Sequence, residues 1–313
     1  MQILFLGNND MAVACLERVI AMGEKVVGIV VNYGISPDDL FLRSMFACAR
    51  KARISLYVPE RVNHPEFISK IREMNIDLII SVAYHQILHK IVLKIPRLGA
   101  INLHPSYLPK YRGKNPLNWV LINGERETGL TIHYMDEGID TGDILLSKKV
   151  RINVKDTADT LQKKFVKIAP LLLEKTLVLI RTGKMCPIPQ KETEASYYPP
   201  RTPEDGRIHW DQASNDIYNL IRSLPLPSYP GAFTYLKNGE KLIFKRALAI
   251  RSRGKNDRQG EFGEIVRIEK GNKIIIRTGD GMIQVRRSDI EMSNGGWVKS
   301  MGEEIAIGTS FVR

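Results

Sequence analysis

The sequence is poor in cysteine and contains no long apolar run. Its 313 residues include three cysteines, Cys15, Cys48 and Cys186, which are odd in number and widely spaced. This pattern favours neither a disulfide framework nor a zinc site, so we expect free thiols and no metal. The apolar stretches are much shorter than a membrane span, and the N-terminal MQILFLGNND lacks the basic region and cleavage site of a signal peptide. We expect a cytoplasmic protein with no membrane contact.

Several common enzyme signatures are also missing. The segment GNND, which follows the first apolar run, has neither the glycine spacing of the dinucleotide fingerprint nor the Lys-Ser/Thr of a phosphate-binding loop. The chain has no HExxH and no GxSxG motif. His85 and His89 are four residues apart, but no third metal ligand stands at a specific spacing from them.

Positive charge is in excess, with 46 Lys and Arg against 34 Asp and Glu and a net charge of +12. An anionic partner is therefore expected, whether nucleic acid, a phosphorylated metabolite or a polyglutamylated cofactor. Basic residues are concentrated between positions 241 and 258, where Asp257 is the only acidic residue. They are Lys241, Lys245, Arg246, Arg251, Arg253, Lys255 and Arg258. A solvated loop is the plainer interpretation of this cluster.

The first third of the chain alternates short apolar runs with segments of helical periodicity. The pattern predicts strands at 3–7, 25–31, 54–58, 77–84 and 100–104, and helices at 11–22, 39–52 and 64–74. Strands that read as continuous apolar runs are covered on both faces by crossover helices. We therefore predict an α/β, Rossmann-like, doubly wound and mostly parallel sheet, which binds ligands at the carboxyl ends of its strands.

Composition changes near residue 185. Two further strands are predicted at 129–135 and 143–152, then a long helix at 156–182 that contains Pro170. A proline-rich stretch follows, and after a helix at 213–223 come short β-like runs with Gly and Asn turns. The predicted organisation is a catalytic domain (1–185), a linker (186–205) and a small open β-barrel of OB type (206–313).

The stretch INLHPSYLPKYRG, residues 101–113, places polar side chains at one predicted strand end. Asn102 and His104 are two residues apart, so they share a face of the strand. Asn is a neutral donor suited to a developing oxyanion, and His suits proton transfer near neutral pH. In MDEGIDTGDIL a nearby carboxylate could orient the histidine ring. From spacing alone, plain turns are the commoner interpretation of both segments.

Longer motifs carry a resemblance. NLHPSYLPKYRGKNPLNW and GLTIHYMDEGIDTGDIL resemble the signature of the folate-dependent formyltransferases, and LYVPERVNHPEF, YPPRTPEDG and PLPSYPGAFTY extend the likeness over most of the chain. The resemblance implies the formyltransferase fold and the co-substrate N10-formyltetrahydrofolate. It implies that Asn102 stabilises the tetrahedral oxyanion, that His104 takes the proton of the attacking amine, and that Asp140 tunes His104.

The resemblance also implies two groups of binding residues. Folate is expected at Gln86, Ile87, Leu88, Lys114, Asp136, Glu137, Gly138, Ile139 and Asp140. A substrate diphosphate is expected near Ser106, Lys110 and Arg112. Lys114 stands where the sugar enzymes have Arg, which keeps the charge and loses the planar fork.

The acceptor amine is expected to belong to a nucleotide-linked amino sugar, because the likeness is greatest to the sugar N-formyltransferases, including the formyltransferase domain of the UDP-4-amino-4-deoxy-L-arabinose enzyme. Methionyl-tRNA formyltransferase is the alternative, with tRNA as partner. Asp38 and Asp39 lie where the tRNA enzyme is expected to insert a basic loop, and they would repel RNA.

Three further expectations stay open. A binding module without catalysis and a formyl-folate hydrolase are the alternatives to a transferase. The intact Asn102, His104 and Asp140 argue against the binding module, and the second domain argues against the hydrolase. Small second domains of this kind often pair, which makes a homodimer an expectation, although no pattern in the sequence fixes a symmetry.

Overall fold

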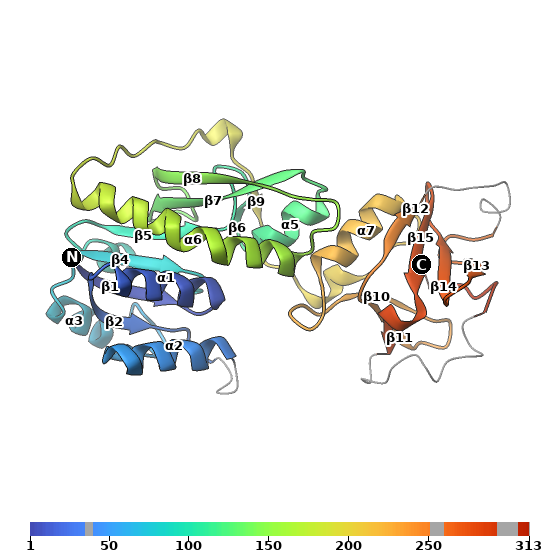
Figure 1. Ribbon diagram of the computed structural model, residues 1–313, viewed down its shortest axis with the longest axis horizontal. Coiled ribbons are helices and arrows are strands. Elements are labelled where there is room, and N and C mark those ends of the chain that lie inside the picture. The colour runs from blue at the N-terminus through green and yellow to red at the C-terminus, as the bar shows by residue number, and fades with distance from the viewer. Residues whose placement is uncertain (35–39, 251–259, 293–305, 313) are drawn as a thin grey trace. The chain divides into compact units, whose positions relative to one another are not determined.

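The computed structural model describes residues 1–34, 40–250, 260–292 and 306–312, and the chain divides into two compact units (Figure 1). Unit 1 comprises Met1–Pro116, Glu127–Arg151 and Gln162–Tyr198, and unit 2 comprises Leu117–Arg126, Ile152–Leu161 and Pro199–Arg313. Across the described ranges, no helix is both long and apolar enough to cross a bilayer.

The predicted strands and helices of the first half are present with small shifts at their ends. The main strands are β1 (Gln2–Gly7), β2 (Lys25–Val30), β3 (Leu56–Tyr57), β4 (Leu78–Val82), β5 (Ala100–His104), β7 (Glu127–Tyr134) and β8 (Ile144–Arg151). The helices are α1 (Asp10–Ala21), α2 (Leu40–Ala52), α3 (Pro65–Glu73), α4 (Lys90–Leu93), α5 (Pro116–Ile122) and α6 (Ala158–Arg181), the last with Pro170 inside it.

Unit 1 is built on one seven-stranded sheet in the order β3-β2-β1-β4-β5-β7-β8 (Figure 1). Strands β1 to β5 are parallel to one another, whereas β7 is antiparallel to both β5 and β8. The prediction of a Rossmann-like, mostly parallel sheet is confirmed. Because β5 has a parallel partner on one side and an antiparallel partner on the other, residues from β5 and β7 meet at the carboxyl edge.

The first helix shows why the local sequence folds in this way. The side chain of Asn9 accepts a hydrogen bond from the Ala12 N–H at 2.9 Å and so caps α1. Ala12, Leu16 and Val19 recur at helical spacing and are fully buried. The buried face of α1 thus begins in the chain soon after β1 ends.

Within the predicted linker, residues 186–198 are hydrogen-bonded into unit 1. Within 186–205, Ile188 exchanges two backbone hydrogen bonds of 2.8 Å with Ile144. The short strand β9 (Tyr197–Tyr198) pairs with β6 (Arg112–Gly113). Gly113 has φ 98°, and a Cβ there would lie 2.4 Å from the Tyr198 carbonyl oxygen. Backbone pairing holds this proline-containing stretch in place, and residues 186–198 are called the crossing segment below.

Unit 2 contains two antiparallel sheets and the helix α7 (Ser214–Ser223). One sheet has the order β10 (Ala232–Tyr235), β11 (Lys241–Phe244), β16 (Ile290–Met292), and the other has the order β12 (Leu248–Ile250), β15 (Met282–Arg286), β14 (Lys273–Arg277), β13 (Ile265–Glu269). The predicted β-rich second domain is present as antiparallel sheets, and its arrangement as an open barrel stays a prediction. The predicted boundary at 206 is replaced by one at Pro199, with two earlier segments joining the same unit.

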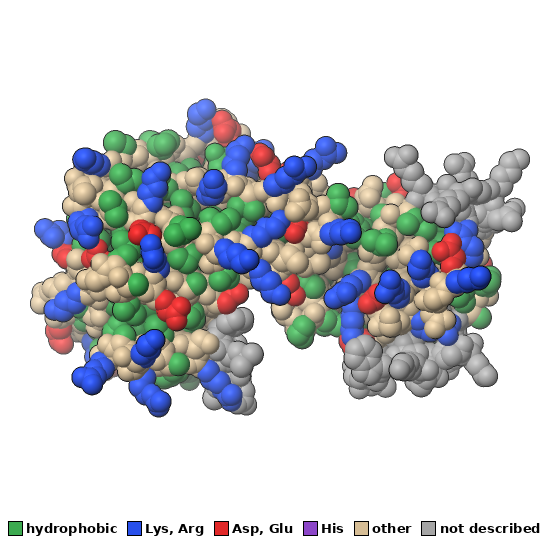
Figure 2. Space-filling model, viewed as in Figure 1, with side chains coloured by type: hydrophobic (Ala, Val, Ile, Leu, Met, Phe, Trp, Pro, Cys, Tyr) green, Lys and Arg blue, Asp and Glu red, His purple; other side chains and the backbone are tan. Residues whose placement is uncertain are grey.

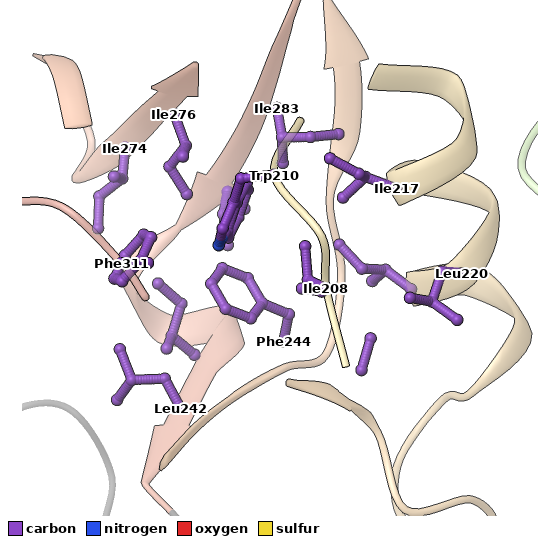
Figure 3. Packing of buried hydrophobic residues seen from close by; sticks show 14 of the residues in the cluster. Ile208, Trp210, Ile217, Leu220, Leu242, Phe244, Ile274, Ile276, Ile283 and Phe311 are labelled. Atoms are coloured by element: carbon purple, nitrogen blue, oxygen red, sulfur yellow. The ribbon is translucent and has the colours of Figure 1, made fainter. Parts of the chain in front are cut away.

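The core of unit 2 is aromatic at its centre (Figure 3). The fully buried Trp210 ring stacks on Phe311, with ring centroids 5.4 Å apart, and meets Phe244 edge to face at 5.7 Å. Its indole N–H donates to the Thr234 hydroxyl at 3.1 Å, so the buried polar atom is satisfied. Unit 1 has its own apolar cluster, in which Leu4, Leu6 and Ile79 are buried with other residues.

Candidate active site

Asn102 and His104 lie at the carboxyl end of β5, as the sequence predicts. Asn102 is level with Ser81 on the parallel neighbour β4 and opposite His133 on the antiparallel neighbour β7. His104 is opposite Thr131. Since residues two apart share a strand face, the strand pairing brings a second histidine, His133, beside the predicted pair.

Asp140 reaches the same place from the loop between β7 and β8. The loop turns tightly because a Cβ at Gly142 would lie 2.0 Å from the Tyr134 carbonyl oxygen, a separation that only glycine permits. The Asp136 carboxylate accepts a hydrogen bond of 2.5 Å from the Thr141 hydroxyl inside the loop. Asp140 itself has φ 57°, in the left-handed region, and its side chain is aimed toward β5.

The Asp140 carboxylate is the meeting point of the site. Its Oδ2 accepts the Gly113 N–H at 2.9 Å and lies 3.4 Å from His104 Nδ1. Its Oδ1 lies 3.4 Å from both Asn102 Nδ2 and His133 Nε2. We call Asn102, His104, His133 and Asp140 the Asp140 cluster.

Charge in this cluster is set by burial and by the two histidines. Burial opposes ionisation of Asp140, but His104, His133 and the Gly113 N–H together hold the pKa of the carboxyl well below its usual range. Burial also lowers the pKa of His104, and His133 lowers it further, while Asp140 and the Tyr111 carbonyl act in the opposite direction. At neutral pH the site therefore holds an ionised Asp140 beside a neutral His104.

The hydrogen bonds of His104 decide which nitrogen can accept a proton. Its Nε2 lies 2.8 Å from the Tyr111 carbonyl oxygen, an acceptor, so Nε2 carries the proton. The lone pair of the neutral ring is then on Nδ1, which faces Asp140. A proton that reaches His104 binds on the side where the Asp140 carboxylate stabilises the resulting charge.

Gln190 holds the backbone of the Asp140 loop. Its Nε2 donates to the carbonyl oxygens of Asp140 at 2.8 Å and Gly142 at 2.7 Å. Its Oε1 accepts from Arg112 Nε at 3.1 Å and Nη2 at 2.9 Å. The crossing segment thus fixes the position of the Asp140 carboxylate.

Arg112 contributes to the fold at the point where the sequence predicts a substrate contact. Its side chain is fully buried, and besides Gln190 it binds both carboxylate oxygens of Glu192 and the Tyr197 hydroxyl. These contacts use all five N–H donors of the guanidinium. No donor remains for a substrate diphosphate, because the crossing segment supplies every acceptor.

The two other predicted substrate contacts differ from each other. Ser106 is fully buried, and its hydroxyl donates to the Lys110 carbonyl oxygen at 2.7 Å, which closes the loop after β5. The Lys110 side chain is exposed. Of the three predicted positions, Lys110 presents its charge to solvent.

Comparison with known proteins gives the family. Residues 1–177 match the model of the formyl transferase family, and residues 201–298 match the model of the formyl transferase C-terminal domain. The chain belongs to the formyl transferase family. The first match contains the whole Asp140 cluster.

Two relatives of different names are similar to this chain. The bifunctional polymyxin resistance protein ArnA of Wigglesworthia glossinidia brevipalpis is 38% identical over 253 residues, which are 80% of this chain and 38% of that protein. The methionyl-tRNA formyltransferase of Alkaliphilus oremlandii is 35% identical over 292 residues, which are 91% of this chain and 90% of that one. This chain therefore spans well under half the length of the first relative and most of the second.

Solved structures share the fold. WlaRD, a sugar 3N-formyl transferase crystallised with dTDP and 5-N-formyl-THF, has a TM-score of 0.68 at 22% identity, over 94% of this chain and 98% of its own. The N-formyltransferase of Helicobacter canadensis, in complex with folinic acid and dTDP-3-aminofucose, also has a TM-score of 0.68 at 22% identity, over 91% and 99%.

The residues predicted to bind folate form two loops that lie side by side. Lys90, at the start of α4, forms an ion pair with Glu137 in the Asp140 loop. Ile87 in the first loop is 63% exposed and Ile139 in the second is 53% exposed. Each of the two loops thus exposes one aliphatic side chain.

The other residues predicted to bind folate have structural or electrostatic roles. The Gln86 amide accepts from the Val62 N–H at 2.8 Å and donates to the Pro59 carbonyl at 3.2 Å, while Leu88 is buried. Burial lowers the pKa of His85, and the positive charge of the exposed Lys114 lowers it further. Gln86 and Leu88 therefore shape the first loop, and Lys114 places a cation beside it.

Sequence reasoning missed two residues of the formyltransferase site. His133 sits in the apolar strand GLTIHYM, where a lone histidine is typical of a core position, although its alternation with Thr131 could have placed it on the same face. Gln190 sits in the predicted linker, and no local signal connects it with Asp140.

Proposed function

We propose that this formyltransferase transfers the formyl group of N10-formyltetrahydrofolate to the amine of a nucleotide-linked amino sugar. The observation that carries formyl transfer is the Asp140 cluster, in which an ionised carboxylate contacts a neutral histidine and an amide donor in a buried site. Support for folate as donor comes from the exposed Ile87 and Ile139 on adjacent loops and from structures of similar fold solved with formylated folates.

The chemistry follows from the positions of the donors and the lone pair. The acceptor amine attacks the formyl carbon, and a C–N bond forms while the carbonyl oxygen becomes an oxyanion. Asn102 Nδ2 is the neutral donor for that oxyanion. His104 Nδ1 takes the amine proton, with Asp140 stabilising the imidazolium, and the proton then leaves with N10 of the folate as the old C–N bond breaks.

The charges of the described residues favour a small anionic acceptor. Lys110 and Lys114 are exposed near the site and can meet a diphosphate. Figure 2 shows Lys and Arg side chains spread over the face that it draws, interspersed with Asp and Glu. On that face, the charges of opposite sign are mixed and form no continuous basic stripe of the kind that follows an RNA backbone.

The basic cluster at 241–258 is described in part. Lys241 lies over the Phe233 ring at 3.6 Å, and Lys245 forms an ion pair with Glu291. Both cations thus have contacts within unit 2. Arg246 is exposed. The other four basic residues of the cluster lie outside the described residues, as do the loop acids Asp38 and Asp39; the four are Arg251, Arg253, Lys255 and Arg258.

Methionyl-tRNA formyltransferase is the second candidate, because a relative of that name matches 91% of this chain and 90% of its own. The match to ArnA covers 80% of this chain. The same Asp140 cluster serves either amine, so the acceptor decides between the two functions.

A competition assay separates the candidates. The purified chain is given N10-formyltetrahydrofolate with equal concentrations of a UDP- or dTDP-linked 4-amino sugar and of methionyl-tRNA. We expect formylated sugar nucleotide as the main product. Efficient formylation of methionyl-tRNA with no sugar product would replace the proposal by the second candidate, and release of formate without either product would indicate a hydrolase.

The His104→Ala variant tests the site independently of the acceptor. Loss of the proton acceptor should reduce kcat by about 10²–10⁴. His209, exposed in unit 2, offers a matched control, and His209→Ala should keep wild-type turnover. Equal kcat for His104→Ala and the wild type would remove His104 from the mechanism.

A further inference from the structure

The crossing segment, residues 186–198, lies between the two ranges that match the family models, which end at residue 177 and begin again at residue 201. It contributes no residue to the Asp140 cluster, and the proposed mechanism does not use it. One of its side chains, Gln190, nevertheless binds the backbone of the loop that carries Asp140. A side chain from outside both ranges therefore supports the central carboxylate of the site.

The orientation of the Gln190 amide is fixed from both ends. Its Oε1 accepts from Arg112 Nε at 3.1 Å and Nη2 at 2.9 Å, and a guanidinium offers only donors, so the oxygen faces it. Nε2 then faces the carbonyl oxygens of Asp140 at 2.8 Å and Gly142 at 2.7 Å, which are acceptors only. The fully buried Arg112 is itself bound by both carboxylate oxygens of Glu192. A single orientation of the amide satisfies all four of its bonds.

The backbone at Asp140 has a conformation that needs such support. Its φ of 57° lies in the left-handed region, which a residue with a Cβ holds only where the surroundings impose it. One of the two carbonyl groups bound by Gln190 belongs to Asp140 itself, and the other belongs to Gly142, two residues later. Release of these carbonyl groups would let the backbone relax and would move the carboxylate with it.

His104 is held by the same segment through a different contact. Its Nε2 lies 2.8 Å from the Tyr111 carbonyl oxygen, and the Tyr111 N–H donates to the Ser196 hydroxyl oxygen at 2.9 Å. The Tyr111 ring also stacks on Tyr198, with ring centroids 4.7 Å apart. The crossing segment thus supports the imidazole at one nitrogen, while Gln190 supports the carboxylate that lies 3.4 Å from the other.

Three consecutive amides of β6 distinguish the pairing of this strand from the position of the carboxylate. The N–H groups of Arg112 and Lys114 donate to carbonyl oxygens of the crossing segment at 2.8 and 3.2 Å. Gly113, between them, donates instead to Asp140 Oδ2 at 2.9 Å. The outer two amides therefore report on the pairing of β6 with β9, and the Gly113 amide reports on Asp140.

We propose that Gln190 is a positioning residue for formyl transfer, whose two hydrogen bonds to the Asp140 loop hold the carboxylate against His104 Nδ1. Gln190 acts through the backbone of Asp140 and not on the reacting atoms. The kinetic part of this proposal rests on the proposed function, and the structural part does not.

Two substitutions separate the two ends of the amide. Gln190→Met keeps the length of the side chain and removes its hydrogen-bonding atoms. Gln190→Glu keeps an acceptor for the buried Arg112 and removes the two donors to the loop. Gln212, exposed in unit 2, offers matched controls, and Gln212→Met and Gln212→Glu should give wild-type values in every measurement.

The first test does not depend on activity. Amide hydrogen exchange in the full chain, followed by NMR with ¹⁵N-labelled glycine, arginine and lysine, compares the three amides at 112–114. In Gln190→Glu we expect exchange at Gly113 to become about tenfold faster, the factor for one lost hydrogen bond, with Arg112 and Lys114 at their wild-type rates. An unchanged rate at Gly113 overturns the proposal. Faster exchange at all three amides overturns it as well, because Gln190 then holds the strand and not the carboxylate.

The second test is a double-mutant cycle on kcat, measured below the unfolding transition of each variant. Gln190→Met should lower kcat about tenfold to a hundredfold, as expected for a displacement of about 1 Å, with the acceptor KM unchanged. In the Asp140→Asn background the same substitution should lower kcat less than about twofold, because the carboxylate that Gln190 positions is already absent. The full loss in both backgrounds would show a role independent of Asp140 and would overturn the proposal.

The pH profile is a readout that a loss of stability alone would not move. Burial lowers the pKa of His104, and the charge of Asp140 opposes this effect. Among the described residues, Asp140 from its loop and His133 from β7 are the titratable groups that face His104. A displaced carboxylate opposes burial less, so the acid limb of kcat/KM should move to lower pH in Gln190→Met. A limb at the wild-type position contradicts a displacement of the carboxylate.

The two proposals fail in different ways. A wild-type chain that formylates neither acceptor defeats the proposed function, while the exchange rates at 112–114 still decide whether Gln190 holds Asp140. A wild-type chain that formylates the sugar, with Gln190 variants of equal kcat and unmoved pH profile, keeps the proposed function and overturns the role of Gln190.

Discussion

At the scale of single residues, the site depends on one carboxylate that stays charged in a buried position. Asp140 has an exposed fraction of 12%, a depth at which an isolated carboxylate would favour its protonated form. Two histidines and a backbone N–H offset that cost. Burial, together with His133, holds the pKa of His104 below its usual value, so that His104 is neutral at pH 7, which is the form that can accept a proton.

The Asp140→Asn variant tests this balance through pH. Asp140 raises the pKa of His104 against the effect of burial, so loss of its charge should lower that pKa. The acid limb of kcat/KM, where His104 becomes protonated, should then move to lower pH, while kcat falls by about 10²–10³. Asp143→Asn, an exposed position in the same loop, is the control. A limb that moves to higher pH would contradict the prediction.

The alternation of side chains along a single strand was enough to predict only part of the site. The two-residue spacing of Asn102 and His104 fixes a shared face, and the structure places both on it. The pairing of Asn102 with His133 depends on the register between two strands, which no spacing within either strand records. Asp140 was available through the family resemblance, since a loop acid carries no local signal of its partner.

At the scale of elements, the alternation of apolar runs and amphipathic helices was enough to predict the sheet. It was not enough to predict how the crossing segment is held. Continuous apolar strands and amphipathic helices predict the parallel order because burial on both faces requires it. The crossing segment has prolines and little periodicity, which favours a linker. It is held instead by backbone pairing and by the buried Arg112, whose partners lie 78 to 85 residues later in the chain.

The Arg112→Lys variant separates the structural role from the predicted substrate contact. Lysine keeps the charge and loses the planar fork, so buried acceptors on Gln190 and Tyr197 lose hydrogen bonds. We expect the free energy of unfolding to fall by about 1–3 kcal/mol, with KM for the acceptor unchanged. Lys110→Ala, at the exposed predicted contact, should give the reverse: a higher acceptor KM and unchanged stability. A raised acceptor KM in Arg112→Lys at wild-type stability would restore the substrate role.

At the scale of the whole molecule, chemistry and the second domain are built on separate cores. Every residue of the Asp140 cluster, Gln190 and Arg112 belongs to unit 1. The core of unit 2 is centred on Trp210, Phe244 and Phe311 (Figure 3). Damage to this aromatic centre should therefore affect stability before it affects the site.

The Phe244→Ala variant tests that separation. Removal of a fully buried aromatic ring costs about 3–5 kcal/mol of unfolding free energy, so scanning calorimetry should show a transition at lower temperature for unit 2. Below that transition, the affinity for formyl-folate, measured by titration calorimetry, should equal the wild-type value. Phe46→Ala is the matched control, because it makes the same substitution at a position on α2 that is 47% exposed. It should leave both measurements unchanged. A loss of folate affinity in Phe244→Ala at a temperature where the chain is folded would show that the integrity of unit 2 is required at the site.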